Sequence, residues 1–113
     1  MKMLKSVLID PFDQSISEVV HEDSLAAMYK LMDCKLVEAV HRNDRGNAIT
    51  GDSKHYLYVD EEGMYKVNQQ AFIVAGKMIM GRALVRRADR EGNDIDATIC
   101  SQDLKMLVRF PRC

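Results

Sequence analysis

The segment Lys77–Arg87, KMIMGRALVRR, constrains the fold more than any other part of the sequence, because it is the longest apolar run with strand character. Side chains alternate between the two faces of a strand. One face of this segment carries the small or branched residues Ile79, Gly81, Ala83 and Val85. The other face carries Met78, Met80, Arg82, Leu84 and Arg86. We therefore expect one central strand, opened by Gly76, with a closely packed face and a mixed face.

Length and charge narrow the class of protein. A chain of 113 residues with 47% hydrophobic and 29% charged residues is typical of one folded domain, residues 1–113. The net charge of −1 gives no field that would hold a polyanion, which disfavours nucleic-acid binding. No apolar run approaches the roughly 18 residues of a membrane span, and the N-terminus lacks a signal-peptide core. We expect a cytoplasmic protein without membrane contact.

The residues that commonly bind metals are scattered along the chain. Cys34, Cys100 and Cys113 are far apart and odd in number, which favours free thiols over a disulfide or a zinc site. Acidic residues cluster at Asp60–Glu62 and between Asp89 and Asp96, without the spacing of a calcium loop. We expect no metal and no cofactor, with the acidic clusters in solvated turns.

The first half of the chain predicts a hairpin, a helix and a third strand. Met3–Asp10 is rich in branched residues, and Asp10-Pro11 ends it before a second strand, Ser15–Val20. Asp23-Ser24 is a helix start signal. The helix that follows places four apolar residues at helical spacing on one side: Leu25, Met28, Leu31 and Met32. Lys35–Arg42 reads as the third strand.

The second half begins with a loop at Asn43–Gly51 and a fourth strand at Lys54–Asp60. The turn after this strand predicts a positive φ at Gly63. Tyr65–Ala75 is compatible with a strand or with a turn leading into residues 72–74. Ser101 is expected to cap a short C-terminal helix, followed by a strand over Val108–Phe110.

These elements predict an α+β fold: a curved mixed or antiparallel sheet of about five to six strands, with one main helix and a short C-terminal helix on a single face. One such helix leaves part of the sheet uncovered. The apolar strip of Met78, Met80 and Leu84 is therefore a candidate surface for a homo-oligomer.

The candidate site residues are basic and aromatic rather than catalytic. No nucleophile elbow, zinc-protease pair or phosphate-binding glycine loop occurs. The three histidines, His21, His41 and His55, are isolated in sequence, and each lies in or next to a predicted strand, where a hydrogen-bonded surface histidine is the usual case. We predict no catalytic residue. The predicted ligand-binding residues are Arg82, Arg86, Tyr56, Tyr58, Lys54 and Arg42. Arginine forks bind phosphate oxygens and tyrosine rings stack on bases. The alternative is that these arginines pair with Asp and Glu across the sheet.

Several segments together resemble a small domain family of unknown function that is found mainly in phages, plasmids and other mobile elements. They are LIDPF (residues 8–12), LYVDEEG (57–63), GRALVRRADREGND (81–94) and VRF (108–110). The chain departs from the family in a longer polar loop, Asn43–Ser53, and in its last three residues, 111–113.

The resemblance implies a biological context rather than an active site. We expect a non-catalytic binding protein of a phage or mobile element that sequesters a host nucleotide signal, as an anti-defence sponge. Its partner would be a small phosphorylated nucleotide. The alternative is a protein-interaction module that modulates a host enzyme by direct contact, through a sheet edge or the methionine face.

Overall fold

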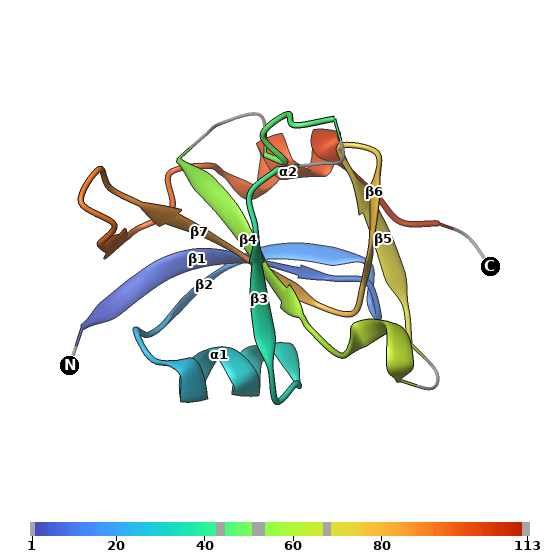
Figure 1. Ribbon diagram of the computed structural model, residues 1–113, viewed down its shortest axis with the longest axis horizontal. Coiled ribbons are helices and arrows are strands. Elements are labelled where there is room, and N and C mark those ends of the chain that lie inside the picture. The colour runs from blue at the N-terminus through green and yellow to red at the C-terminus, as the bar shows by residue number, and fades with distance from the viewer. Residues whose placement is uncertain (1, 43–44, 51–53, 67–68, 112–113) are drawn as a thin grey trace.

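The fold is described from a computed structural model, which places residues 2–42, 45–50, 54–66 and 69–111. Figure 1 shows the chain in order. The elements are β1 (Met3–Asp10), β2 (Ser15–Glu22), α1 (Leu25–Met32), β3 (Val37–Val40), β4 (His55–Asp60), the 3₁₀ turn η1 (Gly63–Tyr65), β5 (Ala71–Val74), β6 (Lys77–Met80), β7 (Ala83–Ala88), β8 (Asp94–Ile95), α2 (Ser101–Leu107) and β9 (Val108–Arg109).

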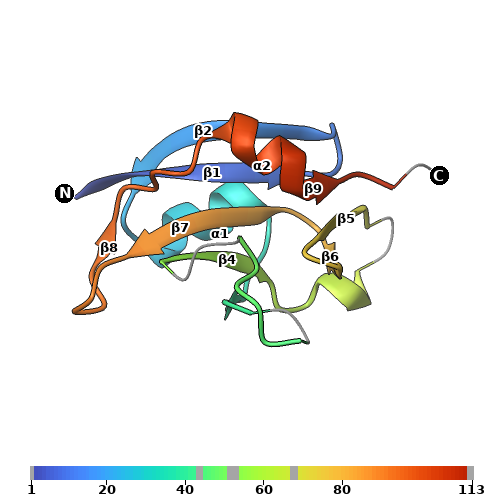
Figure 2. The same cartoon turned by 90° about the horizontal axis from the view of Figure 1, so that it is seen from above.

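The strands form two antiparallel sheets. The larger sheet has six strands in the order β2-β1-β7-β4-β3, with β8 paired to the end of β7, and the smaller has the order β6-β5-β9. The strand pairs in both are antiparallel. The β7–β8 hairpin lies at the opposite end of the molecule from the three-stranded sheet (Figure 1 and Figure 2). The predicted α+β class is confirmed.

The segment Lys77–Arg87 is not one strand, and that prediction is wrong. Gly81 has a φ of +89°, a left-handed conformation that glycine adopts without steric cost. Its N–H donates to the carbonyl of Gln70 at 2.7 Å, so the chain leaves the smaller sheet at this point. β6 before the bend pairs with β5, and β7 after it becomes the centre of the larger sheet.

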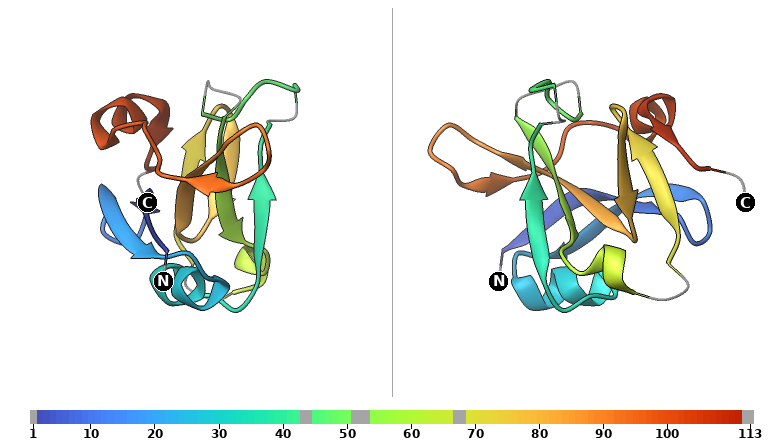
Figure 3. Two further views of the ribbon diagram at one scale, coloured as in Figure 1. Left: turned by 90° about the vertical axis from the view of Figure 1, so that its left-hand side faces the viewer. Right: turned by 45° about the vertical axis from the view of Figure 1, so that its right-hand side comes forward.

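Opposite faces of β7 pack into two separate cores. Ala83 and Val85 belong to the larger core, which lies between the two sheets and includes Leu104 of α2. Leu84, on the other face, packs against Met28 and Met32 of α1. The helices therefore cover opposite faces of the sheet, contrary to the single-face prediction (Figure 3).

This packing also separates the apolar strip proposed as an oligomer surface. Leu84 is fully buried beneath α1, whereas Met78 is 59% exposed on the smaller sheet. The prediction that Met78, Met80 and Leu84 form one surface is wrong, because the bend at Gly81 assigns them to different sheets.

Most predicted elements exist, with differences at their ends. β1 has the predicted bounds, β2 continues to Glu22, and β3 is shorter than Lys35–Arg42. Ser24 caps α1 by accepting from the N–H of Ala27 at 3.2 Å. Leu25, expected on the buried side of α1, is 55% exposed. Ser101 is the first residue of α2 and Cys100 takes the N-cap position, without a side-chain cap.

Two further expectations concern loops and histidines. Residues 43–44 and 51–53 of the predicted loop, and Arg112 and Cys113, lie outside the described residues. His21 and His55 are buried rather than on the surface. Each has a structural partner: the His21 ring meets the hydroxyl of Ser6 at 2.7 Å, and Nε2 of His55 accepts the N–H groups of Thr98 and Ile99.

Neither helix in the described part of the chain is long and apolar enough to span a bilayer.

Candidate functional site

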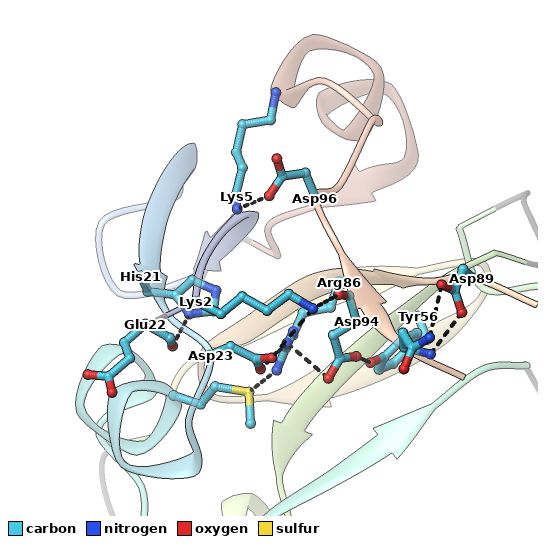
Figure 4. Close-up of polar contacts among 12 residues, drawn as sticks. Lys2, Lys5, His21, Glu22, Asp23, Tyr56, Arg86, Asp89, Asp94 and Asp96 are labelled. Carbon is cyan, nitrogen blue, oxygen red and sulfur yellow. Dashed lines mark hydrogen bonds and ion pairs between the residues drawn. The ribbon is translucent and has the colours of Figure 1, made fainter. Parts of the chain in front are cut away.

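Arg86, a predicted phosphate ligand, lies inside the protein. It is 2% exposed, and its Nη2 contacts Oδ1 of Asp23 at 2.9 Å and Oδ2 of Asp94 at 3.2 Å (Figure 4). Its Nη1 donates to the sulfur of Met28 at 3.0 Å. Its guanidinium group is occupied by carboxylates from the turn before α1 and from β8, which is the pairing that the sequence gives as the alternative to ligand binding.

Tyr56 is part of the same buried network. It is 6% exposed, and its hydroxyl donates to Oδ1 of Asp94 at 2.7 Å. Burial, and then the hydrogen bonds with Asp94 and Tyr58, raises the pKa of Tyr56 well above its usual value. The ring of His41 stacks on it with centroids 4.9 Å apart and planes at 23°. Tyr56 therefore supports an exposed histidine ring instead of offering its own ring to a base.

The ring of Tyr58, like that of Tyr56, contacts other side chains of the protein. Its ring meets that of Tyr56 edge to face, with centroids 5.2 Å apart. The Cζ of Arg86 lies 5.5 Å from the Tyr58 centroid. Tyr58 also packs against the core beneath α1, so it serves the interior face of the sheet.

Arg82 lies in a separate cluster of ion pairs at the bend before β7. Its Nε contacts Oδ2 of Asp10 at 3.1 Å, its Nη1 lies 3.8 Å from Asp33, and its Cζ is 4.6 Å from the centroid of Phe12. It lines a polar cavity of about 180 Å³. The alternative of ion pairing therefore describes Arg82 and Arg86, since each pairs with carboxylates from other elements.

Lys66 and Asp60 form the other side of this cavity. Their ion pair measures 2.6 Å, and Lys66 also donates to the carbonyl of Asp33 at 3.1 Å. The hydrogen bond to Asp60 raises the pKa of Lys66. Burial, followed by the nearby Asp60 charge, raises the pKa of the Cys34 thiol. These groups satisfy one another, and a neutral thiol is a poor nucleophile.

A different cavity gathers the cationic side chains of Lys54, Arg87 and Arg90. It has a volume of about 470 Å³ and lies where the start of β4 meets the β7–β8 hairpin. We call it the basic groove and define it by the lining residues His41, Lys54, Tyr56, Arg87, Asp89 and Arg90. Of the six predicted site residues, Lys54 and Tyr56 lie here. Arg42 does not; it donates to the carbonyl of Gly46 at 2.9 Å.

Arg87 is the residue of the basic groove with the most distinctive environment. No other described residue forms a hydrogen bond or ion pair with its guanidinium group, and its Nε is buried without a partner. Arg86 has a buried Nε in the same state, but its Nη2 contacts two carboxylates, so the two arginines differ at their terminal nitrogens. An arginine that lacks an internal partner has donors left for an external acceptor.

The carboxylate in the basic groove is already engaged. Oδ1 of Asp89 accepts the N–H groups of Glu91 at 3.0 Å and of Asn93 at 2.8 Å, and Oδ2 accepts from the Asn93 amide. These bonds, that from Asn93 first, lower the pKa of Asp89. Asp89 therefore fixes the hairpin turn as an anion, with its carboxylate oxygens bonded inside the turn.

The sequence marks Arg87 as one of the basic residues beside Arg82 and Arg86, but it does not place His41, Arg87 and Arg90 together. The segment RRADR contains both arginines, but assigning them to one cavity requires the register between β4 and β7. His41 reaches Tyr56 because β3 and β4 pair with Val40 opposite Leu57. That pairing has no local signal in the sequence.

Within the described residues, no group of three or more His, Cys, Asp or Glu side chains is arranged to hold a metal ion. The two described cysteines, Cys34 and Cys100, are free thiols.

Comparisons with protein-family models, with curated proteins and with solved structures found no match to this chain.

Proposed function

We propose that the protein works by binding a small phosphorylated ligand, with a nucleotide as the preferred class, in the basic groove. The observation that carries this proposal is Arg87, whose guanidinium group has no partner among the described residues. Lys54 and Arg90 line the same cavity. Three cationic residues beside one committed carboxylate favour an anion, and arginine suits phosphate oxygens through its planar set of donors.

The size and the aromatic lining of the basic groove support a nucleotide over inorganic phosphate. Its volume of about 470 Å³ lies within the range of roughly 300–1,000 Å³ common to small-ligand sites. The His41 ring is exposed and is backed by Tyr56, which Asp94 holds in place. A base can stack on such a ring, as bases do on aromatic side chains in nucleic-acid-binding proteins.

The biological setting remains that of the sequence resemblance. A protein of a phage or mobile element that binds a host nucleotide signal in this way would lower the free concentration of the signal by occupancy, as an anti-defence sponge. What supports this setting is the set of segments 8–12, 57–63, 81–94 and 108–110. Binding without catalysis suits the arrangement of the groove, where no nucleophile is paired with a base among the described lining residues.

Isothermal titration calorimetry with a panel of nucleotides tests the proposal. The panel comprises cyclic dinucleotides, cyclic mononucleotides and ADP-ribose, with inorganic phosphate alongside. We expect at least one nucleotide to bind, and binding to weaken as salt is raised, because exposed charges are screened. Arg87→Gln and Arg90→Gln should each weaken binding by about tenfold, equivalent to about 1.4 kcal/mol.

Lys105→Gln is the matched control, since it removes one positive charge from an exposed position on α2. This variant should bind like the unmodified protein. Thermal unfolding of each variant verifies that it is folded. The proposal is wrong if no member of the panel binds, or if binding survives both arginine substitutions unchanged.

A further inference from the structure

β3 forms the outer edge of the larger sheet. It pairs with β4 and, among the described strands, with no other. Figure 3 shows it in the left panel at the side of the molecule, with no strand beyond it. An edge strand presents unpaired main-chain N–H and C=O groups to its surroundings, and an added strand can pair with them.

The register identifies which groups face outward. The N–H of Glu61 donates to the carbonyl of Leu36 at 3.1 Å, and the next pair is Val37 with Asp60. Antiparallel pairs alternate between those that exchange hydrogen bonds and those that do not. Glu38 and Val40 therefore bond toward β4, and Val37 and Ala39 direct their main-chain groups to the free edge.

The open part of the edge is short. The N–H of Ile49 donates to the carbonyl of His41 at 3.0 Å, and Arg42 bridges Ala48. These contacts occupy the strand beyond Val40. A docked segment would therefore pair with the main-chain groups of Val37 and Ala39 and take the rest of its contacts from side chains.

An apolar groove lies beside this edge. It has a volume of about 250 Å³ and separates the end of the larger sheet from β6. We call it the edge groove; its walls are Val40 and Val59 on one side and Met78, Ile79 and Met80 on the other. Met78 is 59% exposed, and flexible methionines adapt to different partner side chains. Val40 and Glu38 share the face of β3 that borders the groove, because they are two residues apart.

The charged residues that line the edge groove indicate which kind of segment can bind there. Glu38 and Glu61 line it as exposed carboxylates, and Lys77 lines it as a cation. The carboxylate of Asp60 is bound to Lys66. A second copy of β3, paired about Glu38 so that Val37 and Ala39 exchange bonds, would place Glu38 opposite its own copy. Like charges directly opposite destabilise a strand pair, so the edge favours a different, basic segment.

We propose that the β3 edge and the edge groove bind an extended segment of another protein, in which a Lys or Arg and an apolar residue lie two positions apart and so share one face. Main-chain bonds to Val37 and Ala39 hold the segment as an additional strand. Its apolar side chains enter the edge groove, and a cation lies opposite Glu38. The proposal is independent of the ligand site, since the two grooves lie at opposite ends of β4.

A displayed library of random linear peptides, roughly eight residues long to exceed a typical strand, tests the proposal on the full chain. We expect enrichment of sequences in which a basic and an apolar residue lie two positions apart. Ala39→Pro removes an outward N–H and should weaken the enriched peptides by at least about tenfold without unfolding the protein, since proline is tolerated at strand edges. Glu38→Lys should weaken them by reversing the charge.

Three further measurements separate loss of the fold and self-pairing from loss of peptide binding. Circular dichroism and thermal unfolding verify the fold of both variants, and Glu38→Lys remains informative if Ala39→Pro fails to fold. Sedimentation of the protein alone detects self-pairing. A dimer abolished by Ala39→Pro would assign the edge to a second copy and overturn the proposal. So would a library without enrichment, enriched peptides lacking basic residues, or binding that both variants leave unchanged.

Discussion

At the scale of single residues, Gly63 is required because there is no space for a side chain, whereas the sequence predicts that it is required for a positive φ. Its φ is not positive, unlike that of Gly46, Gly76, Gly81 and Gly92. A Cβ placed on Gly63 would lie 2.6 Å from the carbonyl oxygen of Met80, so the main chain of β6 passes too close for any side chain. Glycine serves here because two backbone segments meet.

Gly63→Ala should therefore destabilise the protein by about 2 kcal/mol, within the usual range for an added methyl group that forces backbone shifts. Urea unfolding measures the change in free energy. Gly76→Asn is the control: Gly76 has a φ of +76° and open space around it, and asparagine tolerates this conformation. Equal stability of Gly63→Ala and the unmodified protein would contradict the close approach.

The partners of the arginines could not be read from the sequence for a related reason. Arg86 finds Asp23 63 positions earlier, and Arg82 finds Asp10 72 positions earlier. The sequence indicates that Asp and Glu are available, but the choice of partner depends on which strands are neighbours. Arg87, one position from Arg86, has its side chain on the other face of β7, where none of the described carboxylates pairs with it.

At the scale of elements, α1 illustrates how a short helix depends on its ends and on one docked face. It has eight residues, too few for stability in isolation. Met28 and Met32 are each 2% exposed and pack against Leu84. Ser24 caps its start, and Asp33 ends it in the left-handed region with a φ of 53°. The predicted start was accurate because its signal is local, and three of the four predicted apolar positions pack into the core while Leu25 is exposed.

Ser24→Ala should lower the free energy of unfolding by about 1 kcal/mol, because it leaves the N–H of Ala27 without its acceptor. Chemical denaturation with a helix-sensitive signal measures the loss. Ser24→Asp keeps an acceptor at the cap and should retain stability within about 0.5 kcal/mol. If both substitutions cost the same, the cap is not the source of the effect.

The strands show where local signals fail. β1, β4 and the apolar half of β7 alternate as the sequence predicts, and Leu57 and Val59 face the larger core while Tyr58 faces α1. The bend at Gly81 was missed because alternation runs through it without a break: Ile79, Ala83 and Val85 all enter the same core. The alternation of side chains predicts correctly which residues share a face, but it does not indicate that β6 and β7 belong to different sheets.

At the scale of the whole molecule, the network around Asp94 ties together elements that are far apart in the chain. Asp94 accepts from Tyr56 of β4 and pairs with Arg86 of β7, which in turn holds Asp23 before α1. These contacts are drawn in Figure 4. The class of fold followed from composition and periodicity, whereas this network and the basic groove depend on strand order.

The network predicts a loss of stability at alkaline pH. The pKa of Tyr56 is raised in the folded protein, chiefly by burial, so its neutral form contributes stability that is fully present below the unfolded tyrosine pKa of about 10. Above that pH the unfolded state loses the proton more readily, and the contribution falls as pH rises. Lys66, whose pKa is also raised, acts in the same direction.

Tyr56→Phe separates the two contributions, because it keeps the ring and removes the ionisable hydroxyl. Between about pH 8 and about pH 11, the unmodified protein should lose more stability than Tyr56→Phe, as measured by urea unfolding at each pH. Tyr58→Phe serves as the comparison in the same sheet. Parallel pH profiles for the unmodified protein and Tyr56→Phe would show that Tyr56 does not carry the effect.

The bend at Gly81 has a mechanical consequence. β6 ends at Met80 and β7 begins at Ala83, so the small sheet is tethered to the middle of the large one and not to its rim. A displacement of the small sheet would therefore move β7, the strand that pairs with both β1 and β4 in the large sheet. Because Ile79 of the small sheet and Ala83 and Val85 of the large sheet also share one core, we expect the two sheets to unfold together.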